Sequence, residues 1–193
     1  MPWNKQFDQD VVLDRAMQIF WKNGYAATSM QDLVDTMEIN RASIYATFGD
    51  KRSLFLASLR MFDASVRLEV LSRLRLGRKP AAAVRDLFES FLEQAMDGGF
   101  SRGCLITNTA LELAAHDPEV AGIVADAQTE IECFLKDRIL AGQAAGEIRF
   151  ELDAAATAKG LLASLIGLMV LIRSRPEKSL LKSVVSEALG RLK

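Results

Sequence analysis

The sequence predicts an all-α protein of about nine helices. Apolar residues recur three and four positions apart along most of the chain, which is the spacing of one helical face, and alternation of apolar and polar residues is rare. Ala and Leu are abundant, and hydrophobic residues make up 50% of the 193 residues, enough for a sizeable core. Glycines, prolines and capping residues then mark where each helix begins and ends.

The first two helices follow from their caps. Apolar spacing predicts a helix over residues 10–22, and Gly24 ends it because glycine adopts the left-handed cap conformation at no steric cost. Thr28 or Ser29 is placed to cap a second helix. Asp32 follows at close to the spacing of a capping box, which indicates a well-defined helix start.

A tight turn over residues 38–40 separates the second helix from a third. The third helix covers residues 41–48 and stops at Gly49, after which Asp50 is placed to cap a fourth helix. Two short helices joined by such a turn are typical of a helix-turn-helix, in which the second helix of the pair enters the DNA major groove. Residues 1–52 are therefore predicted to form a helix-turn-helix DNA-binding domain.

Residues 53–193 are predicted to form a helical ligand-binding and dimerisation domain. The fourth helix is long and carries the chain from one domain into the other, so the two are mechanically joined. Pro80 opens the next helix, where its missing N–H costs nothing. The fourth and later helices are expected at residues 51–76, 80–97, 104–114, 118–145, 153–173 and 176–192.

The net charge of −1 does not favour DNA binding in general. Residues 1–55 carry six basic and seven acidic side chains, residues 56–79 carry six and two, and residues 80–193 carry twelve and sixteen, which gives −1, +4 and −4. Dedicated nucleic-acid binders are usually basic overall. Any field that attracts DNA must therefore be local.

The sequence lacks the signals of metal-binding, disulfide-rich and secreted proteins. Cys104 and Cys133 are too few for a disulfide framework and are not spaced as a zinc site. The single histidine, His116, has no ligand cluster around it, so neither a metal nor a cofactor is expected. Residues 1–10 are polar, and the longest apolar run, residues 161–172, is too short to span a membrane. We expect a cytoplasmic protein with reduced thiols.

The third helix has the side chains of a DNA-reading helix. Its exposed face offers Arg41, Ser43 and Thr47, and arginine can bind a guanine edge through two hydrogen bonds. Tyr45 lies near the edge of this face, and Ile44 is expected to point into the core. Short polar side chains of this kind let the backbone approach the bases.

Four segments of this region resemble the TetR/AcrR family of bacterial repressors, namely residues 16–20 (AMQIF), 24–30 (GYAATSM), 39–45 (INRASIY) and 48–51 (FGDK). The resemblance implies a homodimer that binds a palindromic operator and releases it when a small molecule enters the C-terminal domain. It also implies which positions reach base edges and which touch the DNA backbone. The first group is Gln31, Arg41, Ala42 and Ser43, and the second is Thr28, Tyr45, Thr47 and Lys51. Many family members carry His where this chain has Thr47.

Two other classes of function apply to helical proteins of this size. Motifs of three helices also serve as protein-interaction units, so an adaptor that binds no DNA is the alternative. An enzyme is not expected, because the sequence shows no nucleophile–base pair, phosphate-binding loop or metal cluster.

A helical domain of this kind can hold a ligand between its helices, in a mainly apolar pocket with a few polar anchors. Cys104, Asn108 and Glu112 are spaced four apart, which places a thiol, an amide and a carboxylate on one helical face. The candidate lining residues are Phe62, Phe88, Phe91, Met96, Phe100, Cys104, Asn108, Leu111 and Phe134. For each large apolar side chain the alternative is an ordinary place in the core.

The segment that begins at Gly103-Cys104 resembles a branch of the same family whose members respond to electrophiles, oxidants or aromatic compounds. That resemblance implies a sensing thiol at Cys104. A helix start and the neighbouring Arg102 would favour its thiolate form. The alternative is a small buried hydrophobic residue at a tight junction. Cys133 is expected to be inert.

The last two helices, residues 153–173 and 176–192, suit dimerisation. The first is apolar nearly all round, and such a helix must be buried on every side. We expect one face to be covered by its own chain and the other by a partner chain, with burial inside one chain as the alternative.

Release from DNA requires two states, one with the two reading helices about one DNA turn apart and one with them spread. The fourth helix is the expected lever, since it joins Lys51 at the DNA to Phe62 near the pocket. The sequence leaves open the effector, the operator and the choice between repression and activation.

Overall fold

The computed structural model describes residues 7–76, 79–96 and 102–192. In this part of the chain every regular element is a helix, which confirms the all-α prediction. The elements are α1 (Gln9–Asn23), α2 (Met30–Met37), α3 (Arg41–Phe48), α4 (Lys51–Phe62), the π-helix η1 (Asp63–Leu68), α5 (Glu69–Arg75), α6 (Pro80–Met96), α7 (Leu105–Glu112), α8 (Pro118–Ala144), α9 (Ala154–Ser174) and α10 (Lys178–Gly190). Because α4, η1 and α5 follow one another without a break, the described chain holds nine helical rods.

The predicted caps of the N-terminal helices are present. Ser29 Oγ accepts from the Asp32 N–H at 3.1 Å, and Asp32 Oδ2 accepts from the Ser29 N–H at 2.7 Å, which completes a capping box. Asn40 caps α3 by accepting from the Ser43 N–H at 2.8 Å, and Asp50 caps α4 in the same way. The backbone N–H that each carboxylate accepts lowers the pKa of Asp32 and of Asp50.

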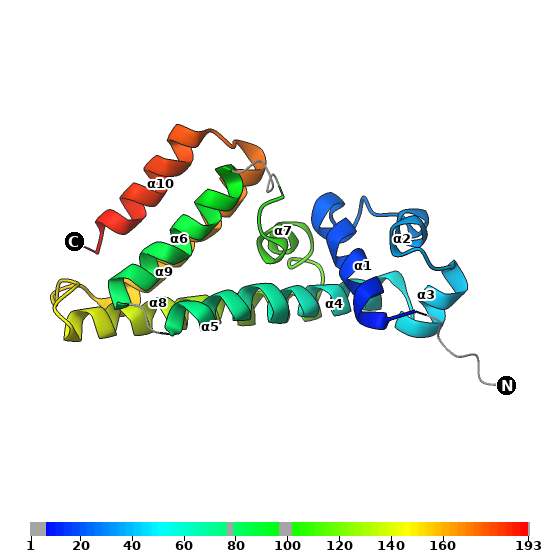
Figure 1. Cartoon of the computed structure of the whole chain (residues 1–193), viewed down its shortest axis with the longest axis horizontal. Coiled ribbons are helices and arrows are strands. Elements are labelled where there is room, and N and C mark those ends of the chain that lie inside the picture. Colours follow the sequence, from blue (N-terminus) through cyan, green and yellow to red (C-terminus); the bar gives the residue numbers. More distant parts are fainter. Residues whose placement is uncertain (1–6, 77–78, 97–101, 193) are drawn as a thin grey trace.

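The rod α4–η1–α5 is the long fourth helix that the sequence predicts, with one difference. Its middle segment, η1, is π-helical, so hydrogen bonds there reach one residue further than in an α-helix. Figure 1 shows the rod running along most of the molecule with α8 beside it. Helices α1, α2 and α3 lie at one end, and α6, α9 and α10 rise from the other. The rod therefore connects the two ends of an elongated molecule.

Two apolar cores hold the helices together. The first joins α1, α2, α3 and α4 through residues such as Phe20, Leu33 and Ile44. It continues into α7 and the start of α8 through Leu105 and Val120. The second joins α5, α6, α8, α9 and α10. Helix α7 thus packs with the N-terminal helices, although it follows α6 in the chain.

Helix α9 has 21 residues and a mean hydropathy of 2.0 in its most apolar window, so its length and composition would allow it to cross a membrane. The whole helix is long and apolar enough for this, although its most apolar run, residues 161–172, is too short when taken alone. Core helices of soluble proteins share this composition, and Leu161, Leu165 and Leu168 of α9 are buried in the second core.

Candidate nucleic-acid interface and effector pocket

Helices α2 and α3 present most of the side chains predicted to read DNA. The exposed ones are Gln31, Arg41, Ala42 and Tyr45, and the half-buried ones are Ser43 and Thr47. Ile44 is fully buried and Phe48 packs against the same core, which anchors α3 by its inner face. The outer face of α3 is therefore free to enter a groove.

Two of these side chains are paired with neighbours on the same helix. Arg41 Nη2 donates to the Tyr45 hydroxyl at 3.3 Å, and its guanidinium lies 5.7 Å from the centre of the Tyr45 ring. Gln31 Nε2 donates to Asp35 Oδ1 at 2.8 Å. A hydrogen bond of this kind contributes on the order of 1 kcal/mol. These pairs can therefore be exchanged for contacts to base edges at small cost.

Lys51 lies over an aromatic ring at the start of α4. Its Nζ is 4.4 Å from the centre of the Tyr25 ring, a cation–π contact that fixes the ammonium group. The Tyr25 ring in turn packs 6.3 Å from Phe20 and 5.0 Å from Phe55, measured between ring centres. Burial, followed by the negative charge of Asp50, raises the pKa of Tyr25. The ring is therefore a neutral phenol that orients a cation beside a helix N-terminus, where phosphates bind well.

Thr28 is not available to a phosphate as the sequence predicted. Its side chain is fully buried, and its hydroxyl donates to the Gly24 carbonyl at 2.6 Å. The hydroxyl stabilises the turn between α1 and α2 instead. Of the two capping candidates, Ser29 is the cap and is exposed.

An exposed charge network connects α4 to α8. Arg52 donates to the two Asp117 carboxylate oxygens at 2.8 and 2.9 Å and to Glu119 at 3.0 Å. Arg60 donates to Glu119 at 2.7 Å. The hydrogen bonds from Arg52 lower the pKa of Asp117 to about 2. Sequence reasoning missed this network because Arg52 and Asp117 are 65 residues apart and no local pattern pairs them.

A small apolar pocket of about 70 Å³ lies between the rod and helices α6, α7, α8 and α9. Its walls are mostly aliphatic, with a few polar groups, as in small-molecule sites. The lining residues are Phe62, Arg67, Val70, Leu71, Leu87, Ser90, Phe91, Cys104, Ile106, Thr107, Gln128, Ile131, Leu162, Leu165, Ile166 and Met169.

Three predicted lining residues, Phe62, Phe91 and Cys104, do line this pocket. Phe88 and Phe134 do not line it, and both are fully buried in the second core. Apolar periodicity identified them as inward-facing, but it does not separate the wall of a cavity from solid core. Leu87, which precedes Phe88 in the sequence, and Ser90, two residues after it, are in the wall instead.

Asn108 and Leu111 also lie outside the pocket wall. Asn108 Nδ2 donates to the Arg102 carbonyl at 2.8 Å, and Leu111 is 73% exposed. Helix α7 turns a different face to the pocket, through Ile106 and Thr107. The predictions for the Met96 side chain and for Phe100 lie outside the described residues.

The Cys104 thiol lies in the pocket wall at the N-terminal end of α7. Burial raises the pKa of this thiol, and hydrogen bonds from the Thr107 and Ile106 amides offset only part of the effect. The helix start therefore favours the thiolate, as expected, but burial outweighs it. The cation that acts on this thiol is Arg67 and not Arg102, whose guanidinium donates to Gln18 at 2.9 Å. Cys133 is exposed on α8.

Arg67 brings a charge into the pocket wall, and that charge is balanced. Its guanidinium pairs with both carboxylate oxygens of Asp63 and lies 3.4 Å from Glu130 Oε2. The Arg67 side chain is only 9% exposed. Because two carboxylates face one guanidinium, the wall offers no spare positive charge to an anionic ligand.

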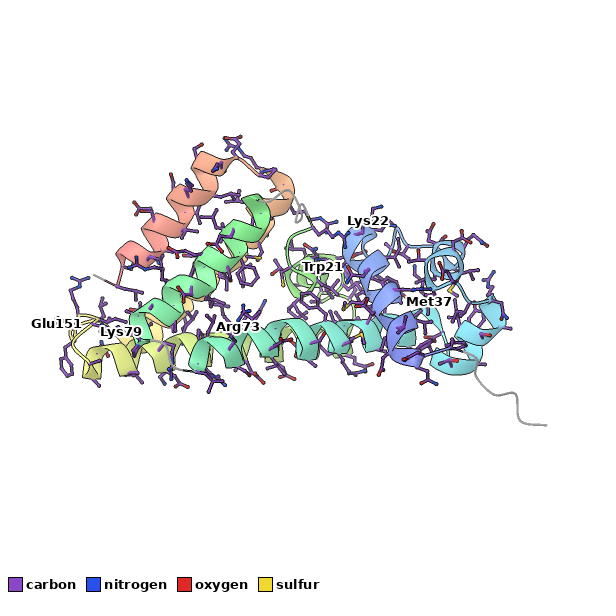
Figure 2. The ribbon with its side chains drawn as sticks, in the orientation of Figure 1. Trp21, Lys22, Met37, Arg73, Lys79 and Glu151 are labelled. Carbon is purple, nitrogen blue, oxygen red and sulfur yellow. The ribbon has the colours of Figure 1, made fainter. Side chains whose placement is uncertain are left out.

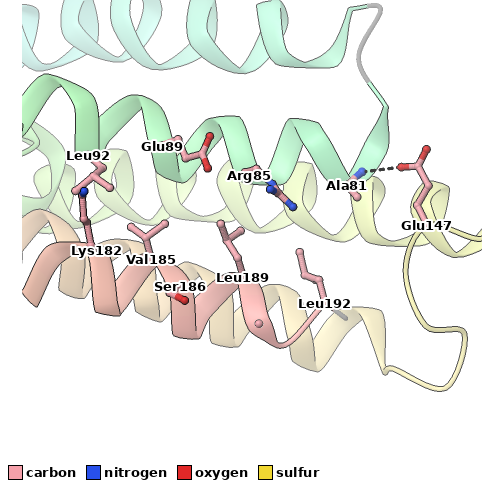
Figure 3. Close-up of a pocket in the computed structure, with 11 residues that line it drawn as sticks. Ala81, Arg85, Glu89, Leu92, Glu147, Lys182, Val185, Ser186, Leu189 and Leu192 are labelled. Atoms are coloured by element: carbon pink, nitrogen blue, oxygen red, sulfur yellow. Dashed lines mark hydrogen bonds between the residues drawn. The ribbon is translucent and has the colours of Figure 1, made fainter. Parts of the chain in front are cut away.

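A second hollow, of about 360 Å³, is an open groove on the surface between α6 and α10. Figure 3 shows its aliphatic residues, such as Val185, beside charged side chains of both signs, namely Arg85, Glu89 and Lys182. Mixed charges on an open surface are typical of a solvated groove. The enclosed apolar pocket is therefore the better candidate for an effector.

The outer side of α9 and α10 carries small and apolar residues. A shallow groove there is lined in part by Gly167, Leu171, Val184 and Ala188. Leu171 and Val184 are only half-buried by their own chain. This surface leaves room for close approach of another helix.

Two family models match the chain. The model of bacterial regulatory proteins of the tetR family matches residues 12–58, and the model of the tetracyclin repressor-like C-terminal domain matches residues 80–186. The HTH-type transcriptional regulator YezE of Bacillus subtilis (strain 168), itself uncharacterized, is 32% identical over 188 residues, which is 97% of each chain. The HTH-type transcriptional repressor ComR of Escherichia coli (strain K12) is 30% identical over 145 residues, which is 75% of this chain and 69% of ComR.

Solved structures share the whole architecture. A cysteine mutant of the TetR family transcriptional regulator CifR, in complex with a 26 bp operator duplex, superposes with a TM-score of 0.86 at 27% identity and covers 98% of this chain and 99% of its own. The reduced form of E. coli NemR superposes with a TM-score of 0.85 at 16% identity over 95% and 96% of the two chains, a likeness of fold alone.

Proposed function

Because this chain belongs to the TetR family of DNA-binding transcriptional regulators, we propose that it is a repressor whose dimer leaves a palindromic operator when a small molecule enters the apolar pocket. The observation that carries this proposal is that two elements of the pocket wall also belong to the core of the DNA-binding helices. The rod and α7 line the pocket through Phe62 and Ile106, and both also pack in the core of the DNA-binding helices. Occupancy of the pocket therefore acts on the elements that hold the reading helix.

The operator-binding surface in this proposal is the outer face of α3 with the start of α4. Arg41, Ala42 and Ser43 approach base edges, together with Gln31 of α2. Tyr45, Thr47 and Lys51 approach the backbone. Support comes from the exposure of Gln31, Arg41, Ala42 and Tyr45, beside which Ser43, Thr47 and Lys51 are half-buried. It also comes from CifR, a relative of 27% identity whose solved complex contains operator DNA.

The effector that fits the pocket is compact, mostly apolar and uncharged. The closed pocket offers about 70 Å³ and mainly aliphatic walls. Its guanidinium, Arg67, is already neutralised by Asp63 and Glu130. Hydroxyl and amide groups remain for one or two hydrogen bonds, from Thr107 and Gln128.

Thiol-reactive compounds are the second effector class, supported by the place of Cys104 in the pocket wall. Since burial raises the pKa of this thiol, its reaction at neutral pH is slow. Non-covalent binding is therefore the primary trigger in our proposal.

The dimer forms through α9 and α10, whose outer groove a second copy would cover, and the regulator works in the cytoplasm. Half-buried Leu171 and Val184 beside Gly167 support this surface, because apolar side chains next to small residues favour close helix packing.

Fluorescence anisotropy of the DNA upstream of the protein's own gene tests the proposal. We expect tight binding by wild-type protein, release by compact neutral compounds, and little release by N-ethylmaleimide within minutes. Rapid release by N-ethylmaleimide that is abolished by Cys104→Ser would make the covalent route primary. If selection from a random duplex library enriches no sequence that the protein binds, the repressor assignment is overturned.

A further inference from the structure

We propose that Glu112 is a positioning residue that ties the turn between α1 and α2 to helix α7, so that one short helix is held both by the pocket and by the DNA-binding unit. The inference rests on the proposed function and deepens it. It adds a second connection between the two halves, besides the rod that the sequence predicts as the lever.

The Glu112 carboxylate reaches across to the backbone of the DNA-binding unit. Oε1 accepts from the Ala26 N–H at 2.7 Å, and Oε2 accepts from the Tyr25 N–H at 3.1 Å. These two amides belong to the turn that follows α1, so they have no partner in that helix. Hydrogen bonds to a charged acceptor are about twice as strong as neutral ones.

Gly24 makes this close approach possible. Its φ is +86°, and a Cβ atom added there would lie 2.9 Å from Glu112 Oε2. Any side chain at residue 24 would therefore both strain the backbone and push the carboxylate away. The helix-ending role that the sequence predicts for Gly24 is thus combined with a second one, the seating of Glu112.

The other end of α7 is held as well. Trp21 Nε1 of α1 donates to the Gly103 carbonyl at 3.0 Å in a buried contact. Gly103 has a φ of +64°, and a Cβ there would lie 2.9 Å from the Met169 carbonyl of α9. Figure 1 shows α7 between α1 and the helices of the second core, and Figure 2 shows Trp21 at this boundary. The segment that leads into α7 and the last residue of α7 therefore both contact the DNA-binding unit.

The pocket touches α7 between these two attachments. Cys104, which follows Gly103 directly, lines the pocket together with Ile106 and Thr107. At the far end, the Tyr25 amide binds Glu112 while the Tyr25 ring carries Lys51. A ligand that displaces α7 therefore acts on the group predicted to bind a DNA phosphate, without passing through the rod.

A test without the natural ligand is possible, because a duplex that favours one position of α7 also changes how accessible the Cys104 thiol in the pocket wall is to a reagent. The readout is the rate at which N-ethylmaleimide modifies Cys104, in a Cys133→Ser background that removes the exposed thiol. It is measured with and without a saturating duplex obtained by selection from a random library. Operator affinity and helical circular dichroism are recorded for each variant.

In the Cys133→Ser protein we expect the duplex to change the Cys104 rate by about fivefold or more, within the usual range of allosteric coupling. Glu112→Ala brings this factor close to one, and Glu112→Gln, which keeps one acceptor, gives an intermediate factor. Glu151→Ala, which removes the same charge at the distant end labelled in Figure 2, keeps the full factor.

The inference is overturned if the duplex changes the Cys104 rate in folded Glu112→Ala or Glu112→Gln protein as much as in the parent. It is also overturned if bound duplex leaves the Cys104 rate of the parent protein unchanged. If no duplex is bound at all, the repressor assignment fails first, and this inference fails with it. The affinity measurement separates the two cases.

Discussion

At the scale of single residues, Lys51 shows how a surface cation is prepared for DNA. The Tyr25 ring holds its ammonium at 4.4 Å, and the first helical turn of α4 adds backbone N–H groups beside it. A phosphate that binds here would meet a charge that is already oriented, so less side-chain entropy is lost on binding.

We predict that Lys51→Ala weakens binding to every duplex sequence to a similar degree. The slope of log K against log salt concentration should become less steep by about one, because one phosphate contact is lost. Anisotropy titrations at several salt concentrations measure both effects. Lys79→Ala, a change of the same charge at the opposite end of the rod, is the control. An unchanged salt slope in Lys51→Ala would count against the phosphate contact.

Residue predictions from the sequence succeeded where a local rule applied. Spacing and capping rules identified Ile44 as buried and Asp32 as part of a capping box. Thr28 was misassigned because its hydroxyl bonds to Gly24, a choice that depends on how the turn folds. Leu111 was misassigned because the register of α7 against the pocket is set by contacts with other helices.

At the scale of helices, the attachment of α8 to α4 depends on charge. Asp117 caps α8 through the Glu119 and Val120 amides and also pairs with Arg52. One carboxylate therefore serves both a helix start and a junction between two helices. The junction is exposed, so we expect its contribution to stability to be modest and reduced by salt.

The variant Asp117→Asn separates these two roles, because the amide oxygen can still cap α8 but carries no charge. The pKa of Asp117 is lowered from 3.8 to about 2 in the folded state, so its stabilising effect is complete above pH 4 and is lost as the pH falls towards 2. We predict that wild type has the higher urea midpoint at neutral pH. The difference should shrink between about pH 4 and pH 2. A difference that stays constant across this range would exclude the ion pair as its cause.

The course of the helices was predictable, and their internal irregularities were not. Caps and breakers fixed α3 and the start of α4 to the residue, since both depend on neighbours in the sequence. The π-helix at residues 63–68 contains no glycine or proline, so no local pattern in the sequence predicts it. The spacing of Asp63 and Arg67 by four residues is visible in the sequence, but the place of Arg67 in the pocket wall depends on distant helices.

At the scale of the whole molecule, the two cores do not follow the order of the chain. Helix α7 comes after α6, yet Leu105 packs with the DNA-binding helices. Its contacts to Trp21 and Tyr25 span more than eighty residues, as shown by separations of 82 and 87. Sequence patterns predicted both halves, but the way one half is fastened to the other depends on such distant pairs.

Dimerisation through α9 and α10 leads to a further prediction. Val184→Glu places a charge in the outer groove of these helices, and burying it in an interface should weaken the dimer by roughly a hundredfold. Sedimentation velocity measures the change, and operator affinity should fall with it. Ser186→Glu, on the side of α10 that faces α6, is the matched control. An intact Val184→Glu dimer would move the interface elsewhere.

The most direct test of the central claim is a hydroxyl-radical footprint of the DNA upstream of the protein's own gene. A dimer that reads DNA with two α3 helices should protect two symmetry-related half-sites about one helical turn, roughly 34 Å, apart. Addition of a compact neutral compound that fills the pocket should remove both at once. A single protected half-site would contradict binding as a dimer, and protection that the compound leaves unchanged at saturation would contradict release through the pocket.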